Sequence, residues 1–274
     1  MHPRNQYLKN KPDFRRLAQQ HPRLMKYFKK SKGSIDFKDP NAIRELTYAL
    51  LSKDFGLKLE IPLDSLCPPI PSRLDYILHI EDLLEGVDEI NGIDIGTGAS
   101  CIYPLLACSR NPNWSFTALE TNARSIEYAQ ENVTRNKMAS RIQITNKSLL
   151  DVIQDPNNAH RQFHVCLCNP PFYASQAQID ESRLFKTSGP IAVCNGSLCE
   201  MVTSGGEYAF ISNIIQQSHV LKKKILWYTS LVGIKRDAER LYGELNQQED
   251  ICECRLDSYR QGVTVRWILS WRHS

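Results

Sequence analysis

The run "CLCNPPFYAS", residues 166–175, places an amide, two prolines and an aromatic ring directly after an apolar segment. The side-chain oxygen of Asn169 and the backbone carbonyl oxygen of Pro170 are two acceptors that can face one nitrogen. Pro170 and Pro171 restrict the backbone, so that both oxygens are preorganised. Phe172 can stack on a planar base held by these acceptors. We therefore predict that Asn169, Pro170, Pro171 and Phe172 are catalytic residues.

The chemistry that these residues suit is methylation of an exocyclic amine such as that of adenine. Such an amine is a poor nucleophile because its lone pair is delocalised into the ring. An enzyme must therefore hold both N–H bonds and push the nitrogen toward tetrahedral geometry. Prolines also end a strand. The motif is thus expected beside the methyl group of a cofactor, placed for in-line transfer, with Tyr173 lining the same pocket.

The segment "GIDIGTGAS" is a glycine-rich turn between an expected strand and an expected helix. Glycines let a ligand approach the backbone closely, at the edge where open α/β sheets bind ligands. The third glycine of a dinucleotide fingerprint is replaced, and a carboxylate precedes the turn, where it would repel a pyrophosphate but suit a cationic or hydroxyl-rich ligand. We predict that S-adenosyl-L-methionine binds here. The candidate cofactor-binding residues of this turn are Asp94, Gly96, Thr97 and Gly98.

A second acidic residue ends the next expected strand, "TALE". Glu120 follows Asp94 by 26 positions, where a carboxylate can accept two hydrogen bonds from ribose hydroxyls. Two acidic strand ends flanking a glycine turn indicate an adenosyl cofactor without phosphates. Asn169 is predicted to contact this cofactor as well as the substrate.

Short apolar runs alternate with helical patterns from Ile90 onward, which is typical of a parallel sheet with crossover helices. An α/β fold is therefore expected. The predicted strands are residues 90–96, 114–120, 141–145, 163–169, 221–233, 251–256 and 263–271, and the predicted helices of this part start at residue 100 and cover residues 121–137.

The first part of the chain is expected to be helical. "DPNAIRELTYALLSKDFG" has Asp39 as N-cap, Pro40 at the first helical position and Gly56 as the stop. "LCPPIPSR" is predicted to be a rigid, non-helical connector, and "LDYILHIEDLLEG" is predicted to be an amphipathic helix. We divide the chain into a basic helical RNA-binding module, residues 1–89, and a methyltransferase core, residues 90–274.

Positive charge is concentrated at the beginning of the chain. Residues 1–38 hold eleven lysines and arginines against two aspartates, and aromatic residues interleave with the cations. Such a segment is either a solvated basic face or a nucleic-acid interface, and the aromatic residues favour the second interpretation. Arg4, Lys9, Lys11 and Lys38 are the candidate phosphate contacts.

Composition is that of an ordinary globular chain, with 42% hydrophobic and 23% charged residues. Neither a membrane-spanning apolar run nor a secretory signal is recognisable, so a reducing compartment and no membrane contact are expected. The nine cysteines suit neither a disulfide framework nor a zinc site. The pairs Cys166 with Cys168 and Cys252 with Cys254 are expected to pack as small hydrophobic residues, and no metal site is predicted.

Several segments resemble one known family across nearly the whole chain. "NPPF" after a strand, with "GIDIGTG" upstream, is similar to the class I S-adenosylmethionine-dependent amino-methyltransferases. "FKDPNAIRELTYALLSKDFGL", "IPSRLDYI", "SGGEYAFI" and "TVRWILSW" narrow the resemblance to the methyltransferase-like 16 family. Its members are N6-adenosine methyltransferases acting on U6 small nuclear RNA and, in some members, on S-adenosylmethionine synthetase transcripts. The resemblance implies a Rossmann-like, seven-stranded class I methyltransferase sheet, mostly parallel with an antiparallel last strand.

The resemblance also implies roles for individual residues. Arg73 matches an arginine that pairs with the methionine carboxylate of the cofactor, Ser100 matches a cofactor-binding position of the glycine turn, and Ser148 matches a residue near the cofactor adenine. Lys147 matches a lysine in a mobile loop near the cofactor. Lys38 and Arg266 match an RNA-binding face, to which Lys147 is also assigned.

The expected function is therefore N6 methylation of adenosine in structured RNA, most of all U6 small nuclear RNA, by a monomeric core in the nucleus, with the cytoplasm as an additional location. Two other functions stay open on the residues alone. One is methylation of adenine or glutamine in DNA, ribosomal RNA or protein, and the other is a catalytically silent RNA-binding scaffold. The chain ends soon after its last expected strand, so RNA affinity is expected to come from the core and the basic N-terminal segment.

Overall fold

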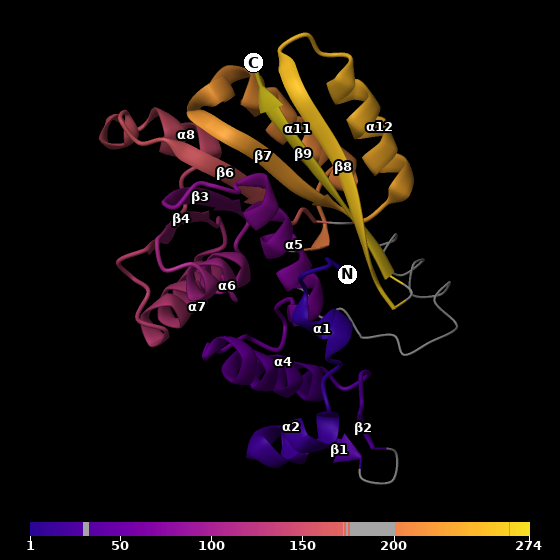
Figure 1. Ribbon diagram of the computed structural model, residues 1–274. Coiled ribbons are helices and arrows are strands. Elements are labelled where there is room, and N and C mark those ends of the chain that lie inside the picture. Colours follow the sequence, from indigo (N-terminus) through magenta and orange to yellow (C-terminus); the bar gives the residue numbers. More distant parts are fainter. Residues whose placement is uncertain (30–32, 172, 174, 176–200, 263) are drawn as a thin grey trace.

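A seven-stranded sheet with the order β5-β4-β3-β6-β7-β9-β8 runs through the protein (Figure 1). The computed structural model describes residues 1–29, 33–171, 173, 175, 201–262 and 264–274. The strands of the sheet are β3 (Ile90–Ile95), β4 (Trp114–Leu119), β5 (Ile142–Thr145), β6 (Phe163–Cys168), β7 (Ile225–Val232), β8 (Ile251–Gln261) and β9 (Thr264–His273). The first five are parallel, and β9 pairs antiparallel with both β7 and β8. The predicted mostly parallel sheet with an antiparallel last strand is confirmed.

Helices cover both faces of this sheet and make two hydrophobic cores. The helices are α5 (Ile70–Leu83), α6 (Ile102–Arg110) and α7 (Ala123–Arg135) on one face, and α8 (Leu149–Gln154), α11 (Gly206–Leu221) and α12 (Lys235–Asn246) on the other. Alternate residues of β6 point to opposite faces, so Val165 and Leu167 join the first core while Cys166 and Cys168 join the second. The interpretation of Cys166 and Cys168 as packed residues is confirmed.

The second cysteine pair follows its prediction in part. Cys254 is half-buried and packs against the second core, whereas Cys252 is exposed, because β8 is an edge strand whose residues are covered less completely than those of β6. Helices α11 and α12 and the short α8 were not predicted, and two short 3-10 helices, η1 (Pro156–Asn158) and η2 (Lys222–Lys224), accompany them.

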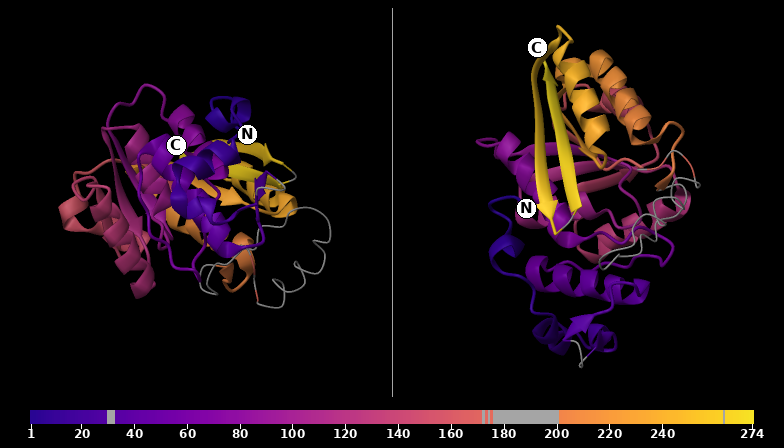
Figure 2. Two further views of the ribbon diagram at one scale, coloured as in Figure 1. Left: turned by 90° about the horizontal axis from the view of Figure 1, so that it is seen from below. Right: turned by 90° about the vertical axis from the view of Figure 1, so that its right-hand side faces the viewer.

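The N-terminal part lies below the sheet in Figure 1 and is seen from two further sides in Figure 2. It consists of α1 (Gln6–Lys9), α2 (Phe14–Gln20), α3 (Pro22–Met25), the two-residue strands β1 (Phe28–Lys29) and β2 (Ser34–Ile35), and α4 (Pro40–Phe55). Helix α4 has the predicted ends. The Asp39 side chain accepts a hydrogen bond from the Asn41 amide, and Gly56 adopts a left-handed conformation with φ of 66°.

Helix α5 begins four residues earlier than predicted. The connector "LCPPIPSR" ends in the first turn of the helix, because Ile70, Pro71, Ser72 and Arg73 are already helical. Proline is tolerated in a first turn, where its missing N–H has no acceptor to lose. This correction matters for the site, since it places Arg73 on a helix.

The predicted boundary at residue 89 does not separate two cores. Residues of α4 and α5 share one hydrophobic cluster with Phe116, Val165 and Ile268 of the sheet. His79 of α5 lies 2.9 Å from the Ser270 hydroxyl of β9 through its Nε2 atom. The division of the chain at residue 89 therefore stays a prediction about function. Among the described residues, no helix has the length and apolar character needed to cross a membrane.

Candidate active site

The candidate catalytic and cofactor residues meet at one edge of the sheet. Strands β3 and β6 are parallel neighbours, with Ile95 opposite Cys168, so Asp94 and Asn169 lie at adjacent carboxyl ends. The chain order of strands reverses between β3 and β6. In open α/β sheets such a switch point is where ligands bind, outside the carboxyl ends of the strands.

The glycine turn leads from β3 to the first turn of α6. Gly96 has φ of 70°, and a side chain there would meet no atom within 4 Å, so backbone conformation rather than space requires glycine. The amides of Gly96 and Thr97 donate to the Leu119 carbonyl oxygen at 2.9 and 3.0 Å, which fixes the turn against the end of β4. Ser100 is buried just before the helix.

Asp94 is a buried acid at the start of this turn. Asp94 is only 1% exposed, and neither of its carboxylate oxygens has a hydrogen-bond partner among the described residues. The buried Thr97 hydroxyl oxygen is likewise without a hydrogen bond among the described residues. Burial and, to a smaller extent, the nearby Glu120 carboxylate raise the pKa of Asp94 to about 7, although Thr97 and the positive charge of Arg73 act in the opposite direction. A cationic ligand group would supply the partner that this carboxylate lacks.

Glu120 lies at the end of β4, as predicted, and is half-buried. One carboxylate oxygen accepts from the Gly98 amide at 2.9 Å, and the other accepts from the amides of Thr121 and Asn122 at 2.8 and 2.9 Å. These bonds hold the carboxylate beside the glycine turn. Each oxygen has two lone pairs, so capacity for ribose hydroxyls remains on the Gly98 side.

Arg73 connects α6 to the NPPF motif through two hydrogen bonds. It is 6% exposed, and its Nη1 atom donates to the Tyr103 hydroxyl at 2.6 Å and to the Asn169 side-chain oxygen at 3.3 Å. Its buried Nε atom has no hydrogen-bond partner among the described residues. A guanidinium with an unused donor in a closed setting suits a ligand carboxylate. The buried polar atoms of Arg73, Asp94 and Thr97 thus fit an amino acid carrying both charges.

Tyr76 and Tyr103 were missed in the sequence, although both support the site. The Tyr76 hydroxyl accepts from the Cys168 amide at 3.2 Å and lies 2.7 Å from the Thr229 hydroxyl, so α5 holds the end of β6 immediately before Asn169. Both tyrosines are followed or preceded by apolar residues in their helices, and nothing in that pattern marks a hydroxyl that faces a strand end.

The residues after Asn169 are described in part. Pro170 is buried and Pro171 half-buried. The amide of Tyr173 donates to the Met201 carbonyl at 2.9 Å, and the amide of Thr203 donates to the Tyr173 carbonyl at 3.0 Å. Phe172 lies outside the described residues, so its stacking role stays a prediction.

Ser148 and Lys147 lie in the loop after β5. Ser148 is the N-cap of α8, where its hydroxyl donates to the Asp151 carboxylate at 2.6 Å and accepts from the Asp151 amide at 3.2 Å. The Lys147 ammonium pairs with Asp155 at 2.7 Å. Both residues are exposed, and their predicted contacts with the cofactor and RNA stay predictions.

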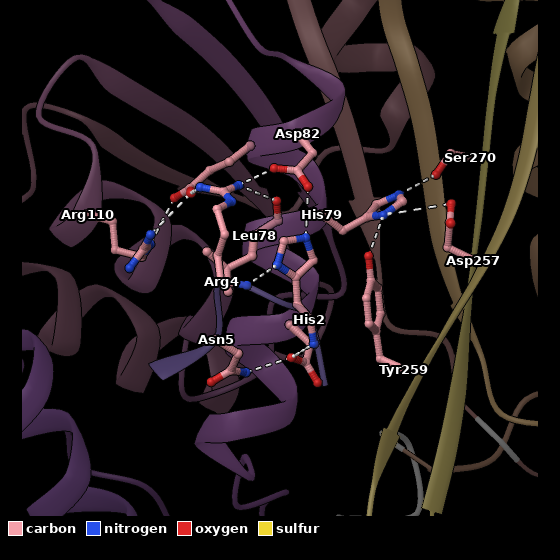
Figure 3. A network of polar contacts seen from close by, with 12 residues as sticks. His2, Arg4, Asn5, Leu78, His79, Asp82, Arg110, Asp257, Tyr259 and Ser270 are labelled. Atoms are coloured by element: carbon pink, nitrogen blue, oxygen red, sulfur yellow. Dashed lines mark hydrogen bonds and ion pairs between the residues drawn. The ribbon is translucent and has the colours of Figure 1, made fainter. Parts of the chain in front are cut away.

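Arg4 differs from the expectation of a cation open to phosphate. Its guanidinium pairs with Asp82, lies 2.9 Å from a Glu81 oxygen and donates to the Leu78 carbonyl oxygen at 3.0 Å (Figure 3). Three acceptors on α5 therefore use the donors of Arg4 within the fold. The sequence alone did not predict these acidic partners, because Glu81 and Asp82 lie more than 70 positions from Arg4 in the chain.

The other candidate RNA contacts have different surroundings. Lys9, Lys11 and Lys38 are exposed. Arg266 is near the start of β9 and donates to the Val265 carbonyl oxygen at 3.1 Å. Burial, and next the positive charge of Arg73, lower the pKa of Arg266. A second guanidinium thus lies on the same side of the sheet as the catalytic motif.

The strand order, the switch point and the acidic glycine turn define a class I methyltransferase with a Rossmann-like sheet. The whole chain, residues 1–274, also matches the profile of a family described as RNA methyltransferase. The chain belongs to this RNA methyltransferase family.

Individual relatives agree with this assignment. RNA N(6)-adenosine-methyltransferase mettl16 of Danio rerio is 39% identical over 99% of this chain and 59% of its own length. U6 small nuclear RNA (adenine-(43)-N(6))-methyltransferase of Caenorhabditis elegans is 36% identical over 100% of this chain and 62% of its own length. The chain therefore spans about three fifths of these two relatives.

Solved structures are similar over nearly their full length. The hMettl16 catalytic domain in complex with MAT2A 3'UTR hairpin 1 has a TM-score of 0.91 and 37% identity, covering 99% of this chain and 95% of that chain. The N-terminal domain of human METTL16 in complex with SAH has a TM-score of 0.82 and 36% identity, covering 99% and 98%. The predicted family resemblance is confirmed.

Proposed function

We propose that this chain is an S-adenosylmethionine-dependent N6-adenosine methyltransferase that acts on structured RNA, with U6 small nuclear RNA as its preferred substrate. The observation that carries the proposal is the contact of Arg73 with the Asn169 oxygen at 3.3 Å, one strand away from the buried Asp94. An acceptor suited to an amine is thus adjacent to groups suited to a charged amino acid. The names of the relatives support the same activity.

In this proposal, different residues of the chain bind different parts of the cofactor. Arg73 binds the carboxylate of its methionine part, Asp94 faces its positive charge, and Glu120 accepts from its ribose hydroxyls. Gly96, Thr97, Gly98 and Ser100 form the turn that borders it. Bound S-adenosylmethionine supplies an electrophilic methyl group on its sulfonium. Ser148 is proposed to lie near the adenine.

Asn169 and Pro170 provide the oxygens that hold the two N–H bonds of the target amine. The hydrogen bond from Arg73 occupies one side of the Asn169 oxygen and orients the amide, which leaves a lone pair for the substrate. The target adenosine must leave its stack to reach this edge of the sheet, at a cost of a few kcal/mol. Phosphate contacts by Lys9, Lys11, Lys38, Lys147 and Arg266 are proposed to offset that cost.

A methylation assay on total RNA, with modified positions read by sequence, tests this function directly. The expected product is N6-methyladenosine in one or a few structured RNAs, foremost U6 small nuclear RNA. Methyl transfer to DNA or protein in place of RNA would contradict the assignment of RNA as the substrate. Binding of S-adenosylmethionine without transfer to any RNA would identify a silent scaffold instead.

Two variants test the cofactor residues separately. Glu120→Ala and Arg73→Ala should each weaken binding of S-adenosylmethionine by about 1.5 to 3 kcal/mol, because each removes a hydrogen bond to or from a charged group. Calorimetry measures this loss, and the exposed Glu131→Ala on α7 serves as a matched carboxylate control. Unchanged affinity in both site variants would place the cofactor elsewhere.

We further propose that the protein acts in the nucleus, since U6 small nuclear RNA is named as the substrate of the relatives from Dictyostelium discoideum and Caenorhabditis elegans. Imaging of the tagged protein in its own cells checks this location. An exclusively cytoplasmic signal would contradict it.

A further inference from the structure

A cluster of two histidines and one aspartate lies apart from the candidate active site. His219 is in the last turn of α11, Asp250 immediately precedes β8, and His273 ends β9. The Nδ1 atoms of His219 and His273 lie 2.9 and 3.2 Å from the same Asp250 oxygen, Oδ2. The three ligand-type atoms lie within 4.8 Å of one another.

The second ring nitrogen of His273 contacts a serine hydroxyl that has two further partners. Its Nε2 atom lies 2.9 Å from the Ser218 hydroxyl oxygen. That hydroxyl donates its single hydrogen to the Ile215 carbonyl oxygen at 2.7 Å and accepts from the Trp271 indole N–H at 3.0 Å. Since Ser218 has no second hydrogen to give, the hydrogen between Ser218 and His273 belongs to Nε2.

This assignment creates a mismatch on the other side of the ring. A neutral His273 with its hydrogen on Nε2 has a lone pair on Nδ1, and that lone pair faces the Asp250 carboxylate at 3.2 Å. Two acceptors at this distance need a positive charge between them. A metal ion satisfies both acceptors while the imidazole stays neutral.

The distances suit a tetrahedral metal site. Zinc bonds to histidine nitrogen and carboxylate oxygen of about 2.0 to 2.2 Å imply about 3.3 Å between neighbouring ligand atoms. The two observed separations of 2.9 and 3.2 Å are close to that value. The bond from His273 Nε2 to Ser218 is the outer contact that ligating histidines normally make, and it orients the ring.

We propose that His219 Nδ1, Asp250 Oδ2 and His273 Nδ1 bind a zinc ion. Two imidazoles and one carboxylate favour zinc over magnesium or calcium, which prefer oxygen ligands only. Three protein ligands leave the fourth position for water. A surface cavity of roughly 520 Å³ borders His273, and the Asp250 side chain is 34% exposed, so solvent reaches the carboxylate. Lys222 adds a positive charge near His273, so the direct bonds rather than the surrounding field must provide the affinity.

The site lies at the edge of the sheet opposite to the candidate active site. His273 follows Trp271, which pairs with Tyr228 near the start of β7, whereas Asn169 follows the end of β6. Figure 1 shows the end of β9 at the top of the molecule, beside α11. The ion would therefore fasten three segments that are distant in sequence and would not take part in methyl transfer.

Titration calorimetry with zinc chloride on the full chain, after chelation and with thiols reduced, tests the proposal. One ion per chain is expected for the wild type. Asp250→Asn and His219→Ala should each lower zinc affinity at least about tenfold, because each removes a ligand. His160→Ala removes an exposed histidine outside the cluster and should change nothing. Absence of saturable binding to the wild type, or equal binding to the ligand variants, would overturn the proposal.

Cobalt substitution separates this site from the cysteines without any variant. Cobalt bound by two histidines and an aspartate should give the visible bands of a four-coordinate ion and no thiolate charge-transfer band. A thiolate band would show that the metal binds to cysteine and would overturn the assignment. His219 is only partly buried, so its variant should fold, and circular dichroism of the metal-free variant verifies this.

Discussion

Asn169 and Arg73 share a hydrogen bond, and this contact couples two tasks that the sequence presents separately. Arg73 is suited to a ligand carboxylate through its free Nε donor, while Asn169 is suited to an amine. A ligand that draws Arg73 toward its carboxylate also moves the donor that orients the Asn169 amide. Cofactor binding is thus expected to tune the geometry of the substrate acceptor.

Substitution of Asn169 by alanine tests the acceptor itself. Methyl transfer should fall by about 100-fold or more, since one preorganised polar group is lost from the transition state. Affinities for S-adenosylmethionine and RNA should stay within a few-fold of the wild type. Single-turnover rates and separate binding titrations distinguish the two effects, and near-normal turnover would refute the catalytic assignment.

The raised pKa of Asp94 predicts opposite pH effects on stability and on cofactor binding. Folding raises this pKa from 3.8 to about 7, so its contribution to stability is fully present below pH 3.8 and is lost as the pH rises through 7. A cationic ligand prefers the ionised carboxylate. Affinity for S-adenosylmethionine should therefore fall by up to about tenfold per pH unit as the pH is lowered from about 7 to 5. Calorimetry at several pH values measures it.

Asp94→Asn is the matched control for that prediction. The asparagine has a similar shape but no charge that titrates, so its cofactor affinity should be lower and nearly independent of pH between about 5 and 7. An equally steep dependence in this variant would assign the titration to another group.

At the scale of elements, the sequence predicted the strands well and the helices only in part. The apolar runs followed by Glu120 and Asn169, and the run that carries Asp94 near its end, are easily recognised because a buried strand and a polar end coincide. The start of α5 was wrong because Pro71 was taken as a helix breaker. Tyr76 was missed because its partners, Cys168 and Thr229, are 92 and 153 positions away.

The cluster of His219, Asp250 and His273 is a second example of contacts that the sequence does not reveal. Asp250 is 31 positions from His219 and 23 positions from His273, which matches no short metal motif. The pairing of β8 with β9 brings Asp250 to His273, and the contacts of Ser218 with Trp271 and His273 place α11, and with it His219, beside them. The cofactor turn and the catalytic motif could therefore be predicted from the spacing of nearby residues. Contacts between residues on distant strands could be found only in the structure.

Two glycines of the first β–α unit should respond differently to alanine. A Cβ atom at Gly92 would lie 2.2 Å from the Phe116 ring, whereas Gly96 has open space but φ of 70°. Gly92→Ala should cost about 3 kcal/mol of unfolding free energy through overpacking, and Gly96→Ala roughly 1 to 2 kcal/mol through backbone strain. Urea denaturation measures both losses.

A second substitution separates the two causes. Phe116→Leu removes the ring edge that the new methyl group meets, so it should recover part of the loss in Gly92→Ala and none of the loss in Gly96→Ala. Equal recovery in the two backgrounds would contradict the steric explanation for Gly92.

For the whole molecule, the basic N-terminal segment can be tested as an RNA-binding surface. Replacing the exposed Lys9, Lys11 and Lys38 by alanine should weaken binding to every RNA and reduce the slope of log affinity against log salt by roughly 0.7 to 0.9 per lost contact. Preference for the target adenosine should survive, because phosphate contacts do not read bases. RNA titrations at several salt concentrations provide the slopes.

Arg4→Ala is the informative comparison, since Arg4 already pairs with Glu81 and Asp82. This variant should leave the salt slope nearly unchanged. A loss of slope as large as that of a lysine variant would show that Arg4 leaves α5 to contact RNA. Unchanged slopes in all variants would mean that the segment is only a solvated face.

The position of β9 has a consequence for how the polypeptide is made. It is translated after all the other strands of the sheet, yet it lies between β7 and β8. While the ribosome is still adding residues 251–261, β8 has no neighbour to pair with, and β7 exposes an open edge. The nascent chain therefore carries an incomplete sheet, whose open β7 edge can pair with other strands until β9 emerges and inserts.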